Sequence, residues 1–220
     1  AILIIRSHGA PRQLIDAAQT SGIEVIDLTC PFVKKIDNYI EQLLKENYFV
    51  IIIGDSHHPE VMSLLETFDN KILVIENLDD LKNKIQSKTF DKLGVVAQTT
   101  QTFNNFKDCV AMFIDISKEL RVFNTICAST EVRQASTERI SNVCDIMLVI
   151  GGKKSANTKR LYEISKKNND YTYQIETVND LKKEWFIDKK KIGITAGAST
   201  PGWIIDEVVE YIHKLKLSLK

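Results

Sequence analysis

Short apolar runs alternate with amphipathic helical patterns along almost the whole chain, and this alternation constrains the fold more than any other feature. The strand-like runs are residues 1–5, 24–28, 49–53, 71–75, 93–97, 121–126, 146–150, 173–177 and 191–196. The clearest helical patterns are residues 31–47, 59–68, 102–120, 130–144, 157–169 and 201–216. Strands that alternate with helices predict an α/β fold, in which parallel sheets carry helices on both faces. Nine strands fit either one wide sheet or several small ones.

Length and charge exclude several classes of protein. The 220 residues suffice for one large domain or two ordinary ones, and 44% of them are hydrophobic. The 29 basic and 29 acidic residues balance, so the chain has no net field that would attract nucleic acid or anionic lipid. No apolar run reaches the roughly 18 residues of a membrane-spanning helix. We therefore expect neither a membrane partner nor, for this chain by itself, a nucleic-acid partner.

The four cysteines are too sparse for a disulfide-stapled scaffold, and no two of them form a CxxC pair. Cys109 lies in a helical pattern and Cys144 lies just before a strand-like run, so both are predicted to be small apolar residues. Cys30 and Cys127 lie instead between strand-like and helical segments. This usage predicts a reducing compartment, the cytoplasm.

Seven junctions between a strand-like run and a helical pattern have similar compositions. They read RSHGAP, DLTCPF, GDSHHPE, AQTTQT, NTICAST, GGKKSANT and TAGASTPG. Serine, threonine and asparagine are good helix N-caps, and proline suits the first helical position. Capping by itself therefore explains any single junction. In GDSHHPE, for example, Asp55 and Ser56 are predicted to cap the turn, and His57 is predicted to face solvent.

The convergence of the seven junctions favours a functional site. Loops at the carboxyl ends of parallel strands are where ligands bind in open α/β sheets, and helix N-termini there offer N–H groups to anions. Residues 151–158 have the composition of a phosphate cradle but match no P-loop, and the sequence has no GxGxxG. Cysteines in two junctions and histidines in two others suggest a metal centre beside an anion site. Thiolates favour soft metals or iron–sulfur clusters.

Taken together, the junctions resemble the LytB or IspH family of 4-hydroxy-3-methylbut-2-enyl diphosphate reductases. The matching motifs are RSHG, DLTCP, HPEV, QTT, TIC with RQ six residues after its cysteine, KSAN and TAGASTP, in the family's order. The resemblance implies three similar α/β units arranged pseudo-threefold around a central cavity, with the first unit incomplete. The units would be residues 1–28, 29–122 and 123–220, the last with a C-terminal helix.

The resemblance also implies a 4Fe–4S cluster held by three cysteines, of which Cys30 and Cys127 are two. The family's third cysteine and a further histidine lie in an N-terminal stretch that this sequence does not include. Glu60 matches the proton donor, and Thr99 or Thr100 matches its hydroxyl partner, with Thr99 favoured. The residues that match substrate-diphosphate positions are His8, His58, Ser155, Asn157 and Ser199. Ala156 stands where many relatives carry a second serine, and Arg133 and Gln134 are expected to support a loop.

The implied reaction is the reductive dehydroxylation of an allylic diphosphate to isopentenyl and dimethylallyl diphosphate, in the non-mevalonate isoprenoid pathway. Its electrons would come from a one-electron donor such as ferredoxin or flavodoxin. Two alternatives stay open: a non-catalytic phosphate-ligand binding domain, and the reductase part of a larger fusion with RNA-binding repeats. Because two thiolates are too few for the cluster, residues 1–220 by themselves are predicted to be inactive. The strands at residues 1–5 and 24–28 are predicted to leave an apolar face exposed.

Overall fold

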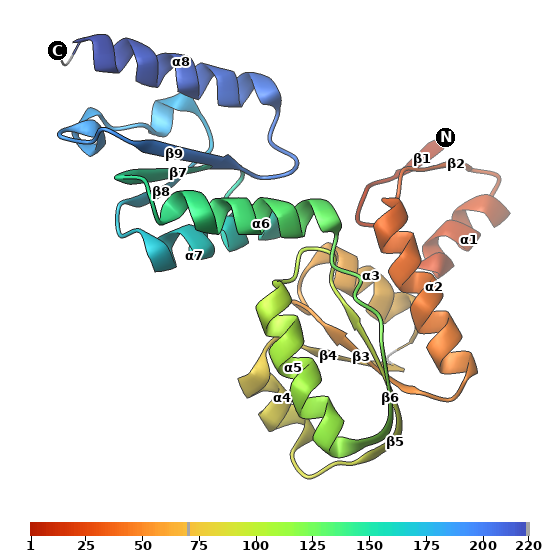
Figure 1. The fold of residues 1–220 in the computed structure, drawn as a ribbon. Helices are drawn as coiled ribbons and strands as arrows, with labels where there is room; N and C mark the ends of the chain where they lie inside the picture. The colour runs from red at the N-terminus through yellow and green to blue at the C-terminus, as the bar shows by residue number, and fades with distance from the viewer. Residues whose placement is uncertain (70, 219–220) are drawn as a thin grey trace. The chain divides into compact units, whose positions relative to one another are not determined.

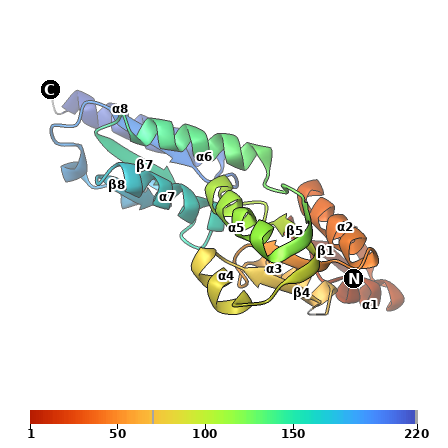
Figure 2. The same ribbon diagram turned by 60° about the horizontal axis from the view of Figure 1, so that its bottom comes forward.

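A computed structural model describes the backbone of residues 1–69 and 71–218 and the side chains up to Leu215. The nine predicted strands are present in it, and every described strand pair is parallel. They form three sheets, with strand orders β1-β2, β4-β3-β5-β6 and β8-β7-β9, so the α/β prediction is confirmed. The chain divides into two compact units, Ala1–Cys127 and Ala128–Lys220, here called unit 1 and unit 2 (Figures 1 and 2). The division into three units stays a prediction.

The larger sheet of unit 1 has β3 and β5 at its centre. Its strands are β3 (Phe49–Ile53), β4 (Ile72–Ile75), β5 (Phe90–Ala97) and β6 (Ser117–Val122). The helices around it are α2 (Pro31–Lys45), α3 (Pro59–Thr67), α4 (Leu78–Ile85) and α5 (Phe103–Ile116). Each strand of this sheet that leads into a helix does so at its carboxyl end, and this arrangement brings the polar junctions to one edge.

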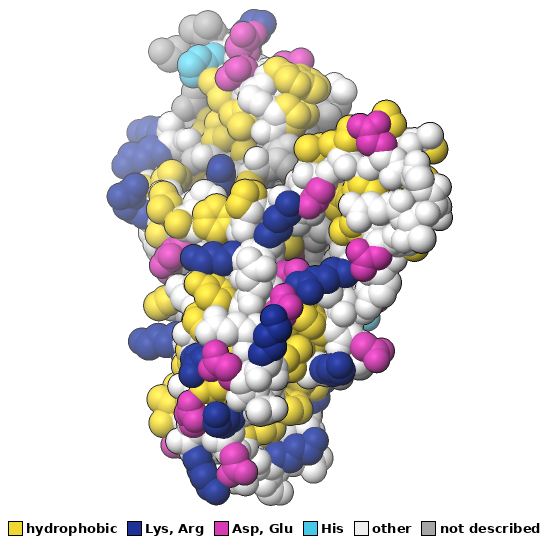
Figure 3. All heavy atoms as spheres, turned by 90° about the vertical axis from the view of Figure 1, so that its right-hand side faces the viewer, with side chains coloured by type: hydrophobic (Ala, Val, Ile, Leu, Met, Phe, Trp, Pro, Cys, Tyr) yellow, Lys and Arg dark blue, Asp and Glu magenta, His cyan; other side chains and the backbone are white. Residues whose placement is uncertain are grey.

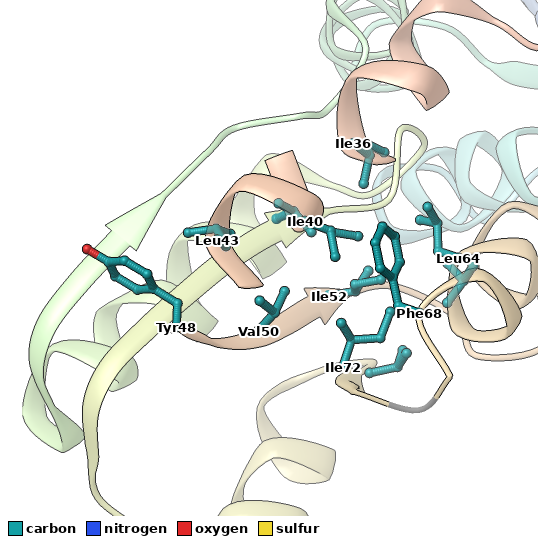
Figure 4. Close-up of a cluster of buried hydrophobic side chains, with 12 residues drawn as sticks. Ile36, Ile40, Leu43, Tyr48, Val50, Ile52, Leu64, Phe68 and Ile72 are labelled. Atoms are coloured by element: carbon teal, nitrogen blue, oxygen red, sulfur yellow. The ribbon is translucent and has the colours of Figure 1, made fainter. Parts of the chain in front are cut away.

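Alternation along β3 explains why helices cover both faces of this sheet. Val50 and Ile52 pack with α2 and α3, whereas Ile51 and Ile53 pack with α4 and α5. Figure 4 shows the first of these clusters, in which Ile36, Ile40 and Leu43 of α2 point toward β3. Successive strand side chains point to opposite faces, so an uninterrupted aliphatic run suits a strand that is buried on both sides.

The small sheet of unit 1 is covered less completely. It pairs β1 (Ile2–Ile5) with β2 (Glu24–Asp27), which are connected by α1 (Arg12–Thr20). Ile2 and Ile4 lie on the same face of β1, and their exposed fractions are 60% and 57%. The predicted exposure of an apolar face in this part of the chain is confirmed.

Unit 2 is built around β7, which is buried along its whole length. Its strands are β7 (Ile146–Ile150), β8 (Thr172–Ile175) and β9 (Ile192–Ala196). Its helices are α6 (Ala128–Ser141), α7 (Ala156–Asn168) and α8 (Gly202–Ser218), with short 3-10 turns at Val178–Asp180 and Lys183–Phe186. Apolar side chains of α8 pack on one face of the sheet, and α6 and α7 lie along the opposite face (Figure 1).

The sequence-based prediction was wrong around residue 117. It extended the helix to residue 120 and began the strand at residue 121, whereas α5 ends at Ile116 and β6 spans Ser117–Val122. The reason is tertiary: Ser117 pairs with Phe90 and Val122 pairs with Val95 along the free edge of β5. The hydrogen bonds of this ladder outweigh a weak local helical pattern.

The surface carries both signs of charge. On the face drawn in Figure 3, lysine and arginine side chains are interspersed with aspartate and glutamate side chains. This mixture agrees with the balanced composition and shows no large basic area on that face. None of the described helices combines the length and the apolarity that crossing a membrane requires.

Candidate active site

Two histidines meet where β1 and β3 end. His8 follows β1 and His58 follows β3, and their rings lie edge to face with centroids 5.2 Å apart. Burial lowers the pKa of both imidazoles, and Arg6 further lowers that of His8. His8 Nδ1 is buried without a hydrogen-bond partner among the described residues. Both imidazoles therefore lose a proton at lower pH than an ordinary histidine does, and a neutral imidazole still offers one N–H group to a ligand.

His58 is also the N-cap of α3. The backbone N–H of Glu60 donates to His58 Nδ1 at 3.2 Å, and Pro59 occupies the first helical position. Nδ1 is thus an acceptor, which leaves the proton on Nε2. Asp55 caps the preceding turn by accepting the N–H of His57 at 2.8 Å, and the His57 side chain is almost fully exposed. The predictions for Asp55 and His57 are confirmed, whereas the Ser56 hydroxyl group lies 3.3 Å from the side-chain atom His57 Nδ1.

Glu60 is the most deeply buried carboxyl group of this loop region, with 1% of its surface exposed. Thr99 donates to it twice: its backbone N–H lies 2.8 Å from Oε1, and its hydroxyl lies 2.6 Å from Oε2. Burial raises the pKa of Glu60, and the two bonds from Thr99 partly oppose that rise. Such a carboxyl group holds a proton at higher pH than an ordinary glutamate. Thr100 accepts a bond from Gln98 instead, so the contact with Glu60 is made by the favoured Thr99.

Cys30 and Cys127 both lie in unit 1, and each directly precedes a helix, α2 and α6 respectively. The Cys30 N–H donates to Ser7 O at 3.0 Å, and the Cys127 N–H donates to Thr99 O at 2.9 Å. Both thiols are partly exposed. Cys109 is instead a residue of α5 whose side chain is fully buried in the core, and this burial raises its pKa to about 11. The prediction of an apolar role for Cys109 fits this environment, whereas Cys144, between α6 and β7, is only partly buried.

The thiols of Cys30 and Cys127 do not form a complete metal site with the described residues around them. Among the described residues, no group of three or more histidine, cysteine, aspartate or glutamate side chains is arranged to hold a metal ion. The soft donors Cys30 and Cys127 suit an iron–sulfur cluster chemically, but a cluster needs further ligands. We call the loops of unit 1 that carry His8, Cys30, His58, Thr99 and Cys127, together with Glu60, the first rim.

The second rim comprises residues 151–158 and 197–202 of unit 2. Ser155 caps α7, with the Thr158 N–H 3.3 Å from Ser155 Oγ, and Ala156 is the first helical residue. Asn157 has 7% of its surface exposed, and neither its amide oxygen nor its amide nitrogen has a partner within the part of the chain that is described. Ser199 is exposed. A buried amide with no bonds is costly, which makes Asn157 a candidate ligand-binding residue.

Close packing holds the second rim together, and it involves a residue that sequence reasoning missed. Gly151 has φ +147°, and a Cβ placed there would lie 2.6 Å from Thr158 Oγ1. Gly197 approaches the same hydroxyl closely. Arg133 Nη1 donates to Ala196 O at 3.2 Å, which is the loop-supporting contact expected of it. The glycines thus bring the ends of β7 and β9 against the start of α7.

Comparison with known proteins identifies the family. The family model described as LytB protein matches residues 1–213. A 4-hydroxy-3-methylbut-2-enyl diphosphate reductase of Aquifex aeolicus is 44% identical over 216 residues, which are 97% of this chain and 74% of that protein. A reductase of the same name from Campylobacter jejuni is 45% identical over 215 residues, covering 98% of this chain and 76% of that protein. The chain thus spans about three quarters of the length of these relatives.

Solved structures agree with this result. A structure of (E)-4-hydroxy-3-methyl-but-2-enyl diphosphate reductase, described as the terminal enzyme of the non-mevalonate pathway, is 44% identical, with a TM-score of 0.62 over 97% of this chain and 76% of that chain. The corresponding reductase from Plasmodium falciparum is 29% identical, with a TM-score of 0.84 over 96% of this chain and 66% of that chain. The polar loops of both units therefore lie within a matched region that extends over nearly the whole chain. The chain belongs to the LytB family.

Proposed function

We propose that this chain is the reductase of an allylic diphosphate, 4-hydroxy-3-methylbut-2-enyl diphosphate. The observation that carries the proposal is the buried Glu60 carboxyl group, which accepts two bonds from Thr99 and adjoins the His8–His58 pair. A carboxylic acid that keeps its proton to higher pH than an ordinary glutamate, beside candidate anion-binding groups, suits the loss of a hydroxyl group from a phosphorylated substrate. Relatives of this name that are 44–45% identical support the same substrate.

The reaction balances as a two-electron reduction. The carbon–oxygen bond of the allylic alcohol breaks, the oxygen leaves as water after receiving a proton, and the allylic carbon framework takes up two electrons and a second proton. Glu60 is the candidate donor of the first proton, and the Thr99 hydroxyl orders the path of that proton. The products are isopentenyl and dimethylallyl diphosphate.

Electrons must come from outside the chain, from a one-electron donor such as ferredoxin or flavodoxin. The family resemblance supplies a 4Fe–4S cluster as the electron relay, with Cys30 and Cys127 as two of its thiolate ligands. Among the described residues, no third side chain joins these two thiols to form a group that could hold a metal ion. The free thiols suit a reducing compartment such as the cytoplasm.

Each unit by itself carries candidate groups for binding the substrate diphosphate. His8 and His58 of unit 1 offer imidazole N–H groups. In unit 2, Asn157 offers both ends of a buried amide. Ser155 and Ser199 add hydroxyl groups, and the first turn of α7 adds backbone N–H groups. Neutral donors and a helix N-terminus can hold a diphosphate without a dense cluster of positive charge.

A phosphate-binding domain without redox chemistry is the second candidate. The observation that favours it is that the described residues contain no group of three metal donors. Protein expressed from the complete gene, purified anaerobically, separates the two candidates. The reductase is expected to be brown, with absorbance at about 400 nm as in other iron–sulfur proteins, and to convert the substrate when a reduced electron donor is supplied. Colourless protein that binds pyrophosphate without turnover would favour the second candidate.

Iron counting after anaerobic reconstitution tests the ligand assignment. Cys30→Ser and Cys127→Ser are each expected to lower the iron content, because each removes a proposed thiolate. Cys109→Ser is the matched control, since Cys109 is buried in the core with a raised pKa. Full iron in the Cys30 or Cys127 variant would remove that residue from the ligand set.

A further inference from the structure

Three neighbouring loops of unit 1 carry the first-rim residues that follow β3, β5 and β6. We call residues 54–58, after β3, the histidine loop; residues 97–100, at the end of β5, the central loop; and residues 123–127, after β6, the cysteine loop. The strand order β3-β5-β6 places the central loop between the other two. Thr99 of the central loop donates two hydrogen bonds to the Glu60 carboxyl group, and these bonds hold the acid against this loop.

Gln98 joins the central loop to the histidine loop. Its side chain is 3% exposed, its Oε1 accepts the Asp55 N–H at 2.9 Å, and its Nε2 donates to Thr100 Oγ1 at 3.1 Å. The carbonyl group of Asp55 in turn accepts the N–H of His58 at 3.1 Å. A single buried amide thus binds the backbone N–H of Asp55, the residue whose carbonyl group accepts the His58 N–H.

The close approach of Gly54 to Gln98 shows that the histidine loop packs tightly on this side chain. A Cβ at position 54 would lie 2.9 Å from Gln98 Cβ and 3.0 Å from Gln98 Oε1. Real Cβ atoms rarely approach other atoms so closely, so the histidine loop can lie over Gln98 only because residue 54 has no side chain. The contact is therefore built into the backbone of the histidine loop as well as into the amide.

Thr125 joins the central loop to the cysteine loop. Pairing with β5 continues past the end of β6: the Phe123 N–H donates to Val95 O at 2.9 Å, and the Cys127 N–H donates to Thr99 O at 2.9 Å. Between these two bonds, Thr125 Oγ1 accepts the Ala97 N–H at 2.8 Å and donates to Ala97 O. One buried hydroxyl group thus replaces a backbone rung of the ladder and brings Cys127 level with Thr99.

We propose that Gln98 and Thr125 are positioning residues that lock the histidine and cysteine loops onto the central loop, so that His58, Glu60 and Cys127 form one rigid group. Their role in the reaction rests on the proposed function, but the lock itself does not. Gln98 holds the histidine loop, and Thr125 holds the cysteine loop. Removing the hydrogen bonds of one residue should therefore loosen its own loop and leave the other loop in place.

Amide hydrogen exchange of the purified chain tests this division of labour. Gln98→Met keeps the side-chain length without the two hydrogen bonds, and Thr125→Val keeps the shape without the hydroxyl group. Gln98→Met is expected to speed exchange about tenfold or more in residues 54–58, and Thr125→Val to do so in residues 123–127, each with less than about twofold change in the other loop. Thr125→Ser, which retains the hydroxyl group, is expected to restore protection.

Thr172→Val is the matched control. Thr172 is equally buried in unit 2, and its hydroxyl group donates to Asn169 O at 2.6 Å. This variant should speed exchange near residues 169–175 and leave both loops of unit 1 unchanged. Equal acceleration throughout unit 1 by Gln98→Met and Thr125→Val would overturn the proposal, because it would indicate a general loss of stability. Unchanged exchange in both variants would also overturn it.

Pyrophosphate binding by calorimetry adds a functional readout. Gln98→Met is expected to weaken binding about three- to tenfold because His58 loses its fixed position, whereas Thr125→Val should change it less than about twofold. If both variants weaken binding equally, the separate roles of the two residues are wrong. If the unsubstituted chain binds no pyrophosphate, the proposed function loses support, and the exchange result still decides whether the lock exists.

Discussion

The two rims differ in how their buried polar groups are satisfied. In the first rim, Glu60 and Gln98 bond to neighbouring loops of the same unit. In the second rim, both ends of the Asn157 amide and the Thr158 hydroxyl group are buried without partners in the described part of the chain. Because buried polar groups are normally paired, the second arrangement is the costlier one in the absence of a ligand.

The difference fits the separate role proposed for each rim. A proton donor needs a fixed position and a shifted pKa before the substrate arrives, and internal hydrogen bonds supply both. An anion-binding group needs free donors, and these cannot be used up internally. His8 bears this out within the first rim, because its Nδ1 is buried and unpaired with any described residue. Unpaired groups thus mark the places where a ligand would complete the structure.

The largest effect is expected from breaking the acid of the first rim. Glu60→Gln keeps the shape of the side chain and removes the acidic proton, so kcat should fall by about 10²–10⁴, with substrate affinity nearly unchanged. Glu66→Gln, an exposed position of the same helix, is the control. Product formation by the protein from the complete gene measures both. Wild-type turnover, or a defect confined to affinity, would remove Glu60 from this role.

A smaller effect is expected from the second rim. Asn157→Ala removes an amide proposed to bind a charged group, which is worth about 1.5–3 kcal/mol, so pyrophosphate should bind about 10- to 100-fold more weakly. Asn168→Ala at the opposite end of α7 is the control, because that amide caps Ile164 O in the same helix. Calorimetry provides the affinities. Equal affinities for wild type and Asn157→Ala would exclude the amide from the anion site.

Substitutions that break a polar contact of the first rim should also cost more stability than substitutions of the second rim. Thr99→Val removes the hydroxyl bond to Glu60 and should cost about 1–3 kcal/mol of the free energy of unfolding of unit 1. Asn157→Leu removes an unpaired amide and should cost less than about 1 kcal/mol in unit 2, or stabilise it. Urea unfolding followed separately for the two units compares them. A larger loss for Asn157→Leu would contradict the contrast between the rims.

The smallest effect concerns pH. Burial raises the folded-state pKa of Glu60 above its ordinary value of 4.5, so the folded chain binds this proton more tightly than the unfolded chain does. The stabilisation is complete below pH 4.5 and is lost as pH rises through the folded-state pKa. The difference in unfolding free energy between wild type and Glu60→Gln isolates this contribution from the histidines, whose lowered pKa values act oppositely. A pH-independent difference would contradict the raised pKa.

Much of the site was visible in the linear sequence. Apolar runs that end in short polar junctions predicted the parallel strands and placed His58, Glu60 and Thr99 at strand ends. Local rules also predicted the turn at Asp55 and the helix start at Pro59. The missed residues are Gln98, Thr125 and Thr158, because an uncharged side chain in a loop is typical of simple capping, and only its distant partner distinguishes it.

Periodic and local patterns in the linear chain were enough to predict the α/β class, the strands and the polar composition of their carboxyl ends. The pairing of strand edges and the partners of buried groups depend instead on the tertiary structure. Residues 117–120 became strand because β5 offered them a free edge. Thr99 and not Thr100 reached Glu60 across 39 residues of sequence. Strand pairing and hydrogen-bond partners of this kind depend on contacts between segments that are distant in the sequence, and a local sequence pattern does not reveal the energies of these contacts.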